Sequence, residues 1–335
     1  MYSNECSGGV YGVYPFAGVA SFLRMPELNT KEAFEKTDFD IGVLGIPYDE
    51  GMPFIPGVRF APRAFREQSL RYNKNGVYSV EEDKVYLRKE LQEDRIADLG
   101  DVAITPTAIP ENWASISDAV RSVLRKRDSH GNQAMLVCLG GDHSVTAPIL
   151  AGFDALGESF HVMHFDSHPD YSSISEGFQY TNAHPFRWVN TYPYVKSITQ
   201  VGIRSVRAFQ TRDSRADGHR VIGMKEYHEM GGAEAVAATL PEGEPVYISF
   251  DIDALDASLV PGCTSAEPNG FTYQEMRENL QAVAKHSRVV GFDIVCVNPL
   301  IDTPNKITSY IGLQLIMEFL GTLCDQPYWK ARYLK

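Results

Sequence analysis

One stretch of the sequence places acidic and imidazole side chains at alternate positions. Asp166, His168 and Asp170 lie two residues apart, so in an extended chain they would point to the same side. Carboxylate oxygens and imidazole nitrogens are common ligands of divalent metals. The spacing therefore predicts that these three residues share a metal centre.

Two further stretches carry the same residue types. Asp251 and Asp253 alternate directly after the apolar run Val246–Phe250, and His143 lies in Gly140–Ser144, directly after another apolar run. Each stretch alone also fits a tight turn or the N-terminal cap of a helix. Their joint occurrence, each behind a strand-length apolar run, favours one shared site.

The chemistry of such a site follows from electrostatics. Four carboxylates and two imidazoles in one crevice would lose hydration and the carboxylates would repel one another, and divalent cations remove this cost. A bridging carboxylate can hold two ions about 3.5 to 4 Å apart, and the ions lower the pKa of a shared water until hydroxide exists near neutral pH. The residues thus predict a hydrolase with two metal ions.

The elements that must position these residues are short apolar runs separated by helix-period segments, one of which opens with the capping box Thr272-x-x-Glu275. Continuous apolar runs fit strands of a parallel sheet that is buried on both faces, and the carboxyl ends of such strands converge on one crevice. We predict a three-layer, doubly wound α/β fold with a mostly parallel sheet and helices on both faces. The predicted strands are Ile41–Ile46, Met135–Leu139, His161–Phe165, Ile198–Ile203, Val246–Phe250 and Val289–Val297.

The composition argues against several classes of protein. The chain has 335 residues, and its formal charge of −12 would repel a nucleic acid backbone. No stretch holds the roughly 18 to 20 uninterrupted apolar residues of a membrane-spanning helix. Five widely spaced cysteines without a C-x-x-C pair predict a reducing, cytoplasmic location. We expect one domain over residues 1–335, with 1–38 as an N-terminal extension packed on it.

The three ligand stretches resemble the signatures of the ureohydrolase family, which includes arginases, agmatinases and related guanidino-compound hydrolases. The resemblance covers most of the chain and implies the arginase-like form of the predicted fold. Further similar stretches occur in the family's order at Gly45–Asp49, Pro56–Arg63, Asp98–Asp101, Gly202–Arg204 and Val297–Pro299.

The resemblance also implies a reaction and a cofactor. A metal-bridging hydroxide would attack the guanidino carbon to release urea and an amine, with Asp170 orienting the hydroxide and relaying its proton. The family usually carries two Mn²⁺ ions, with Ni²⁺ as an alternative of higher intrinsic affinity, and its members are trimers or hexamers. By the family pattern, one ion would be held by His143, Asp166, Asp170 and Asp251, and the other by His168, Asp166, Asp251 and Asp253.

Cys296 departs from the family pattern. Relatives usually have a glutamate there that pairs with the substrate guanidinium, and a thiol offers neither a full charge nor two acceptor oxygens. Loss of one partner of a buried, charge-assisted pair costs about 2 to 5 kcal/mol. Cys296 could instead belong to the core, because cysteine is often buried. If it faces the substrate, the usual hold on a guanidinium is missing.

Other candidate substrate residues also differ from the family. Asn182 stands where relatives tend to have a histidine, and His184 is the candidate acid or base if the alignment shifts by two residues. Glu267 could act in catalysis and supply part of the charge that Cys296 lacks, and Ser265 matches a threonine that faces the substrate. The candidate aromatic contacts are Trp188, Tyr171 and Tyr180.

These departures favour an agmatinase-like guanidino-compound hydrolase over a true arginase, because Tyr171–Glu176 lacks the Asn- and Gly-containing stretch expected for arginine binding. We expect a non-arginine guanidine that is small, alkylated or biguanide-like. Two other hypotheses stay open. The protein could hydrolyse another C–N bond, formimino or amide, or it could be a non-catalytic subunit beside a paralogue. The intact ligand set argues against the last of these.

Overall fold

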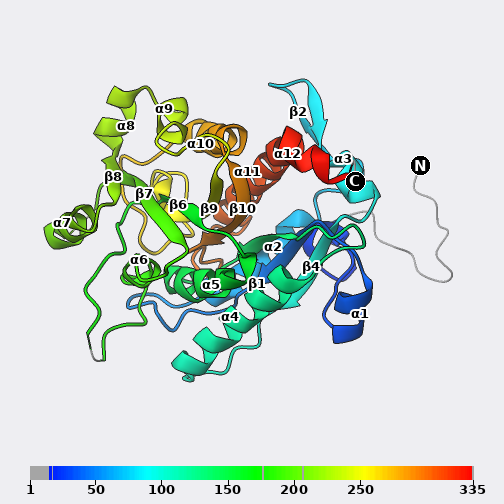
Figure 1. The fold of residues 1–335 in the computed structure, drawn as a ribbon, viewed down its shortest axis with the longest axis horizontal. Coiled ribbons are helices and arrows are strands. Elements are labelled where there is room, and N and C mark those ends of the chain that lie inside the picture. Colours follow the sequence, from blue (N-terminus) through cyan, green and yellow to red (C-terminus); the bar gives the residue numbers. More distant parts are fainter. Residues whose placement is uncertain (1–14, 17, 176, 206, 334–335) are drawn as a thin grey trace.

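An eight-stranded parallel sheet forms the centre of the molecule (Figure 1). The computed structural model describes residues 15–16, 18–175, 177–205 and 207–333. The strand order is β4-β1-β5-β10-β9-β6-β7-β8, and every neighbouring pair is parallel. The strands are β1 (Ile41–Gly45), β4 (Ile96–Asp101), β5 (Met135–Leu139), β6 (Phe160–Phe165), β7 (Val195–Ile203), β8 (Arg220–Gly223), β9 (Pro245–Asp251) and β10 (Arg288–Val295).

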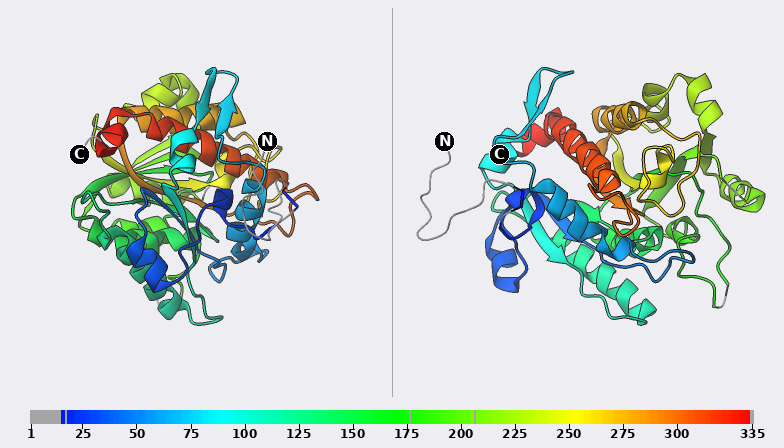
Figure 2. Two further views of the ribbon diagram at one scale, coloured as in Figure 1. Left: turned by 90° about the vertical axis from the view of Figure 1, so that its right-hand side faces the viewer. Right: turned by 180° about the vertical axis from the view of Figure 1, so that it is seen from behind.

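Helices cover both faces of this sheet (Figure 2). On one face lie α10 (Tyr273–His286) and α11 (Ile307–Cys324), and on the other lie α4 (Ile109–Arg125) and α5 (Thr146–Gly152). The three-layer, doubly wound α/β prediction is confirmed. The other helices are α1 (Lys31–Lys36), α2 (Ala61–Ser69), α3 (Arg88–Gln92), α6 (Pro185–Val189), α7 (Ala208–Ala216), α8 (Met224–Met230), α9 (Ala233–Ala237) and α12 (Pro327–Lys330).

Short elements complete the chain. A separate antiparallel hairpin consists of β2 (Val77–Ser79) and β3 (Lys84–Tyr86). The predicted capping box is present, since the Thr272 hydroxyl accepts from the Glu275 amide and the Glu275 carboxylate accepts from the Thr272 amide. The 3₁₀ helices are η1 (Phe22–Arg24), η2 (Val58–Phe60), η3 (His143–Val145), η4 (Phe153–Leu156), η5 (Ile252–Ala254) and η6 (Ala331–Tyr333).

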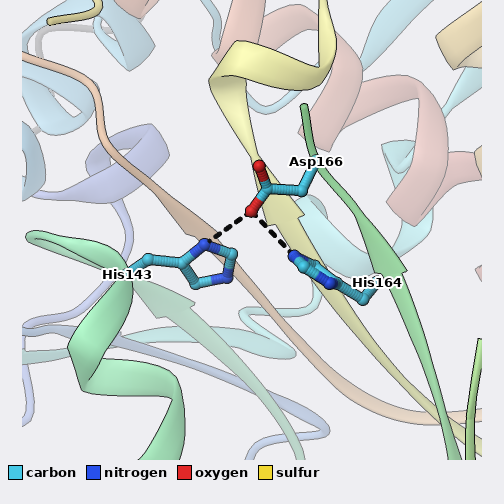
Figure 3. Close-up of side chains that lie close together, drawn as sticks. All are labelled: His143, His164 and Asp166. Carbon is cyan, nitrogen blue, oxygen red and sulfur yellow. Dashed lines mark hydrogen bonds and ion pairs between the residues drawn. The ribbon is translucent and has the colours of Figure 1, made fainter. Parts of the chain in front are cut away.

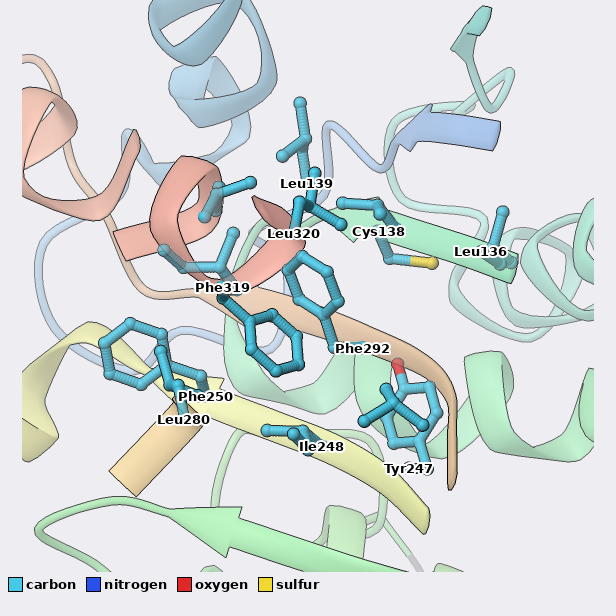
Figure 4. Close-up of a cluster of buried hydrophobic side chains, with 14 of the residues drawn as sticks. Leu136, Cys138, Leu139, Tyr247, Ile248, Phe250, Leu280, Phe292, Phe319 and Leu320 are labelled. Carbon is cyan, nitrogen blue, oxygen red and sulfur yellow. The ribbon is translucent and has the colours of Figure 1, made fainter. Parts of the chain in front are cut away.

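The core lies between the central strands and the helices that cover them. In Figure 4, the Phe292 ring of β10 meets Phe319 of α11 with ring centroids 5.0 Å apart. By length and composition alone, α11 would qualify as a membrane span, but 72% of it is buried inside the protein. It packs against α2 and α10. We therefore interpret α11 as a core helix.

The predicted N-terminal extension packs on the edge of the sheet where the structure describes it. The Phe22 amide donates to the Asp98 carboxylate over 2.7 Å, and the Leu28 amide donates to the Asp98 carbonyl over 2.7 Å. Phe22 and Leu23 are buried. Residues 1–14 and 17 of this extension lie outside the described part of the chain.

All six predicted strands exist, with ends that differ by up to three residues. The sequence pattern missed β4, which carries the polar residues Asp98 and Asp101, and β8, which has four residues. Both are edge strands, and neither has the continuous apolar run on which the prediction depended, since polar residues interrupt β4 and β8 is short.

Candidate metal centre

The predicted ligands follow three of four adjacent strands. The strands β5, β10, β9 and β6 lie side by side in this order, and they are parallel, so their carboxyl ends share one edge of the sheet. His143 lies in η3 after β5, and Asp166 directly follows β6. Asp251 ends β9, and Asp253 lies in η5. The sheet therefore brings residues more than 100 positions apart to one place.

Three carboxylates surround the His143 ring. Its Nδ1 lies 2.9 Å from Asp166 Oδ2, 3.1 Å from Asp170 Oδ2 and 3.2 Å from Asp251 Oδ2. All four residues are buried. This is the first half of the predicted ligand set.

The second half gathers around His168. Its Nδ1 lies 3.1 Å from Asp253 Oδ2 and 3.4 Å from Asp166 Oδ1. The two oxygens of Asp166 thus face two different imidazoles, and the six predicted ligands form one cluster.

The backbone reaches this arrangement differently from the prediction. We expected Asp166, His168 and Asp170 to share a side of an extended chain, but β6 ends at Phe165 and Asp170 has a left-handed φ of 46°. Asp253 likewise sits in a 3₁₀ turn, where its amide donates to Asp251 Oδ1 over 2.9 Å. The expectation of extended backbone is wrong. Turns, and not extended backbone, orient these side chains toward one another.

The hydrogen bonds of His143 test whether a cation fits the cluster. Its Nε2 lies 3.0 Å from Ser249 Oγ, and the Ser249 hydroxyl donates to Asp293 Oδ1 over 2.8 Å. Ser249 can therefore only accept from His143, so a neutral His143 carries its proton on Nε2. The Nδ1 lone pair then faces three carboxylates, and it has no hydrogen-bond partner. Either a proton or a metal ion can satisfy acceptors that point at one another, and a lone pair that faces three carboxylates is a donor set that fits a metal ion.

The same crowding of carboxylates shifts the pKa values of residues in the cluster. Burial and the neighbouring carboxylates Asp253 and Asp166 raise the pKa of Asp251 to about 8. Burial and Asp166 raise the pKa of Asp170 to about 6. Burial lowers the pKa of His143, but the surrounding carboxylates outweigh it and raise that pKa well above its ordinary value. Without metal, protons would supply the missing positive charge.

A cavity of about 570 Å³ opens onto the cluster. Two of the predicted substrate residues, Asn182 and Ser265, line it. The Ser265 hydroxyl donates to Asp253 Oδ2 over 3.0 Å, which connects the cavity wall to the predicted metal ligands. Four of the predicted ligands also line this cavity, namely His168, Asp170, Asp251 and Asp253.

Six other predicted residues are not among those that line the cavity, namely Tyr171, Tyr180, His184, Trp188, Glu267 and Cys296. The Tyr171 hydroxyl donates to the Asp217 carboxylate over 2.6 Å, and the Tyr180 ring packs against Trp113 with centroids 4.9 Å apart. His184 is buried, with Nδ1 2.8 Å from the Thr181 hydroxyl, and the Trp188 indole donates to the Gln179 carbonyl over 2.8 Å. The backbone carbonyl of Glu267 accepts from Arg204. Cys296 is buried, and its thiol interacts with the carboxylate of Asp251. The structure does not bring His184, Glu267 or Trp188 to the ligand cluster.

Sequence reasoning missed two groups of residues near the site. One group consists of polar residues that are buried within mostly apolar strands. A buried polar residue needs a hydrogen-bond partner, so a polar residue inside an apolar run is a signal that the sequence itself carries. The other group lines the cavity from loops, without any such signal. The first group is His164, Gln200, Ser249 and Asp293, and the second includes Phe178, Thr181, Arg207 and Gln210.

Comparison with known proteins agrees with this geometry. The arginase family matches residues 39–321. Guanidinopropionase of Pseudomonas aeruginosa is 31% identical, over 92% of this chain and 93% of that protein. Mitochondrial arginase 1 of Arabidopsis thaliana is 31% identical, over 84% of this chain and 80% of that protein.

A solved structure extends the likeness to the fold. Proclavaminate amidino hydrolase from Streptomyces clavuligerus superposes with a TM-score of 0.79 at 26% identity, over 92% of this chain and 98% of that one. The ureohydrolase prediction is confirmed. The chain belongs to the arginase family, hydrolases that cleave C–N bonds of guanidino or amidino compounds.

Proposed function

We propose that the protein is a binuclear-metal amidinohydrolase that cleaves a non-arginine guanidino substrate to urea and an amine. The observation that carries this proposal is the Nδ1 atom of His143, whose lone pair faces three buried carboxylates beside a cavity. The names of the guanidinopropionase and of the amidino hydrolase support a guanidino substrate.

The six clustered residues would hold two divalent ions, namely His143, Asp166, His168, Asp170, Asp251 and Asp253. Mn²⁺ suits a donor set rich in carboxylates, and Ni²⁺ is the alternative because imidazole accepts it. When bound, such ions supply a water that ionises near neutral pH.

Asp170 is the residue of this chain that we assign to proton transfer. Its carboxyl lines the cavity, so it can reach both the attacking water and the substrate. It would take a proton from the attacking water and pass it to the leaving nitrogen. Ser265 and Asn182 line the same cavity and would contact the substrate.

Two features support a substrate other than arginine or agmatine. Cys296 stands where the family pattern has a glutamate, and it lies against Asp251 without lining the cavity, so the usual charged partner of the guanidinium is missing there. Arg207 lines the cavity, and no described residue forms an ion pair with it, so its charge disfavours a substrate tail that carries an ammonium group. We propose a guanidine without a second positive charge, of the small, alkylated or biguanide-like kind.

Urea release tests this function. Protein loaded with Mn²⁺ or Ni²⁺ is given agmatine, arginine, 4-guanidinobutyrate, 3-guanidinopropionate, guanidine and an alkylated biguanide, with Asp253→Asn as the inactive control. We expect urea from a substrate without an ammonium group. Two bound metals without urea would favour hydrolysis of a formimino or amide bond, and a chain that binds no metal would favour the non-catalytic subunit.

We also propose a homo-oligomer of three or six chains, with a paralogue as the alternative partner. Light scattering should give three or six times the 37.3 kDa chain mass.

A cytoplasmic location stays a prediction. It is supported by four cysteines that are all free, Cys138, Cys263, Cys296 and Cys324, while Cys6 lies outside the described residues.

A further inference from the structure

We propose that His164 is a positioning residue for the metal centre, which holds the Asp166 carboxylate through its Nε2 proton while Gln200 fixes its tautomer. The inference rests on the proposed two-metal site. It assigns a role to a histidine and a glutamine that the reaction above does not use.

His164 reaches the carboxylate that lies between the two imidazole ligands. Its Nε2 is 2.8 Å from Asp166 Oδ2, the same oxygen that lies 2.9 Å from His143 Nδ1 (Figure 3). His143, His164 and Asp166 are fully buried. The three side chains could therefore be read as a metal site in which His164 is a ligand, or as a site in which His164 supports a ligand.

The side-chain amide of Gln200 decides between these two interpretations. One of its N–H groups donates to the Pro169 carbonyl over 2.6 Å, and a carbonyl only accepts, so this atom is the amide nitrogen. The same nitrogen lies 3.0 Å from His164 Nδ1. Nδ1 must then be the acceptor, and the proton of a neutral His164 sits on Nε2. A protonated Nε2 donates to Asp166 and has no lone pair for a metal.

The orientation of Gln200 is itself fixed. The Ser214 hydroxyl of α7 donates to Gln200 Oε1 over 2.7 Å, so both ends of the amide are occupied. A flip of the amide would set its oxygen against the Pro169 carbonyl. The chain of hydrogen bonds thus runs from Ser214 through Gln200 and His164 to Asp166.

Packing prevents the His164 ring from turning away. The ring stacks on Phe186 with centroids 3.8 Å apart and an interplanar angle of 27°. His143 approaches its edge with centroids 5.0 Å apart. A rigid donor that holds one carboxylate oxygen limits the rotation of Asp166, and such outer partners typically change metal affinity by about 10- to 100-fold.

The test uses two substitutions of His164, one that keeps a hydrogen-bond donor and one that removes it. In His164→Gln, the amide nitrogen lies near the position of Nε2 and can still donate, whereas His164→Leu keeps an apolar volume without a donor. The Mn²⁺ dissociation constant of each protein is measured by chelator competition. Thermal unfolding of the metal-free proteins shows whether each variant folds.

We expect the wild type to bind two Mn²⁺ ions, His164→Leu to bind about 10- to 100-fold more weakly, and His164→Gln to stay within about threefold of the wild type. Equal affinity of His164→Leu and wild type would overturn the inference, as would equal weakness of both variants. A wild type that binds no metal would instead overturn the proposed function. If His164→Leu does not fold, Gln200→Met is tested in its place. This variant removes the amide that fixes the His164 tautomer, and it should also weaken Mn²⁺ binding about 10-fold or more.

Discussion

Two buried histidines approach one oxygen of Asp166, and their outer hydrogen bonds give them different roles. The outer partner of His143 is Ser249, which can only accept, so in the neutral ring the nitrogen that faces Asp166 carries a lone pair. The outer partner of His164 is the Gln200 amide, which donates, so its facing nitrogen carries a proton. The tautomer of each ring thus depends on a residue from another strand.

Metal affinity should rise with pH. In the metal-free protein Asp251 has a pKa of about 8 and Asp170 of about 6, both raised by burial first and by neighbouring carboxylates second. Below these values the carboxyls hold protons that a metal must displace. We expect the Mn²⁺ dissociation constant to increase at least about tenfold for each pH unit from pH 8 down to pH 6.

Calorimetry at pH 6, 7 and 8 in buffers of different ionisation enthalpy checks this prediction, because it also counts the protons released. A dissociation constant that does not change with pH would contradict it. Thermal unfolding at each pH serves as the control for folding.

The Cys296→Glu substitution should change the order of preferred substrates. The new carboxylate would lie beside Asp251 and give a guanidinium a charged partner. We expect the ratio of kcat/KM for free guanidine to that for an alkylated guanidine to rise about tenfold or more, which corresponds to about 1.4 kcal/mol. Cys296→Gln has nearly the same volume without the charge and is the matched control. An unchanged ranking in Cys296→Glu would remove the main support for the proposed substrate class.

At the scale of elements, the turn after β5 brings His143 to the site. Gly141 lies in this turn, and a Cβ there would come within 1.6 Å of the Tyr48 carbonyl oxygen. The Asp142 carboxylate accepts from the Gly51 amide over 2.9 Å, and the Ser144 amide donates to it over 2.9 Å. The Gly-Gly-Asp-His stretch is therefore a close backbone contact as well as a ligand position.

Arg66 fastens α2 and the N-terminal segment to the edge strand β4. Its guanidinium donates to both oxygens of Asp98 over 2.8 Å, and both residues are buried. We expect Arg66→Ala to lower the free energy of unfolding by about 3 to 5 kcal/mol, because it leaves the charge of Asp98 buried and unpaired.

Arg63 offers a matched control on the same helix. It pairs with Glu67 at the surface, where the two side chains are 79% and 52% exposed, so Arg63→Ala should cost less than about 0.5 kcal/mol. Urea unfolding of both variants gives the comparison. Similar losses in the two variants would contradict the role of the Arg66–Asp98 pair.

At the scale of the whole molecule, metal removal should lower thermal stability. The ligand carboxylates are held together by the sheet and repel one another once the cations leave. An ion present at 100 times its dissociation constant stabilises the folded state by about 2.7 kcal/mol. We expect the Tm to fall on chelation and to recover when Mn²⁺ is added.

Scanning fluorimetry with chelator, and then with excess Mn²⁺, measures this change. Asp253→Asn is the control, because it weakens one site and should show a smaller recovery. A wild-type Tm that is the same with chelator and with Mn²⁺ would contradict the prediction.

The amino-acid sequence alone was enough to predict six of the eight strands of the central sheet and to group the proposed ligand residues. Continuous apolar runs mark strands buried on both faces, and Asp or His residues directly behind them must lie at one edge of a parallel sheet. For this reason the sequence pattern places His143, Asp166 and Asp251 together at one edge of the sheet. The pattern missed β4 because polar residues interrupt it, and β8 because it has only four residues.

Three-dimensional packing was needed to show which other residues contact the predicted ligands. His184 could act as an acid or base by residue type, yet its imidazole is hydrogen-bonded to the Thr181 hydroxyl and it does not line the cavity. Gln200 and His164 look like polar interruptions of apolar strands, yet they form a chain of hydrogen bonds that ends on Asp166. Direction, burial and tautomer depend on neighbours that come from distant strands, and local sequence spacing carries no information about those neighbours.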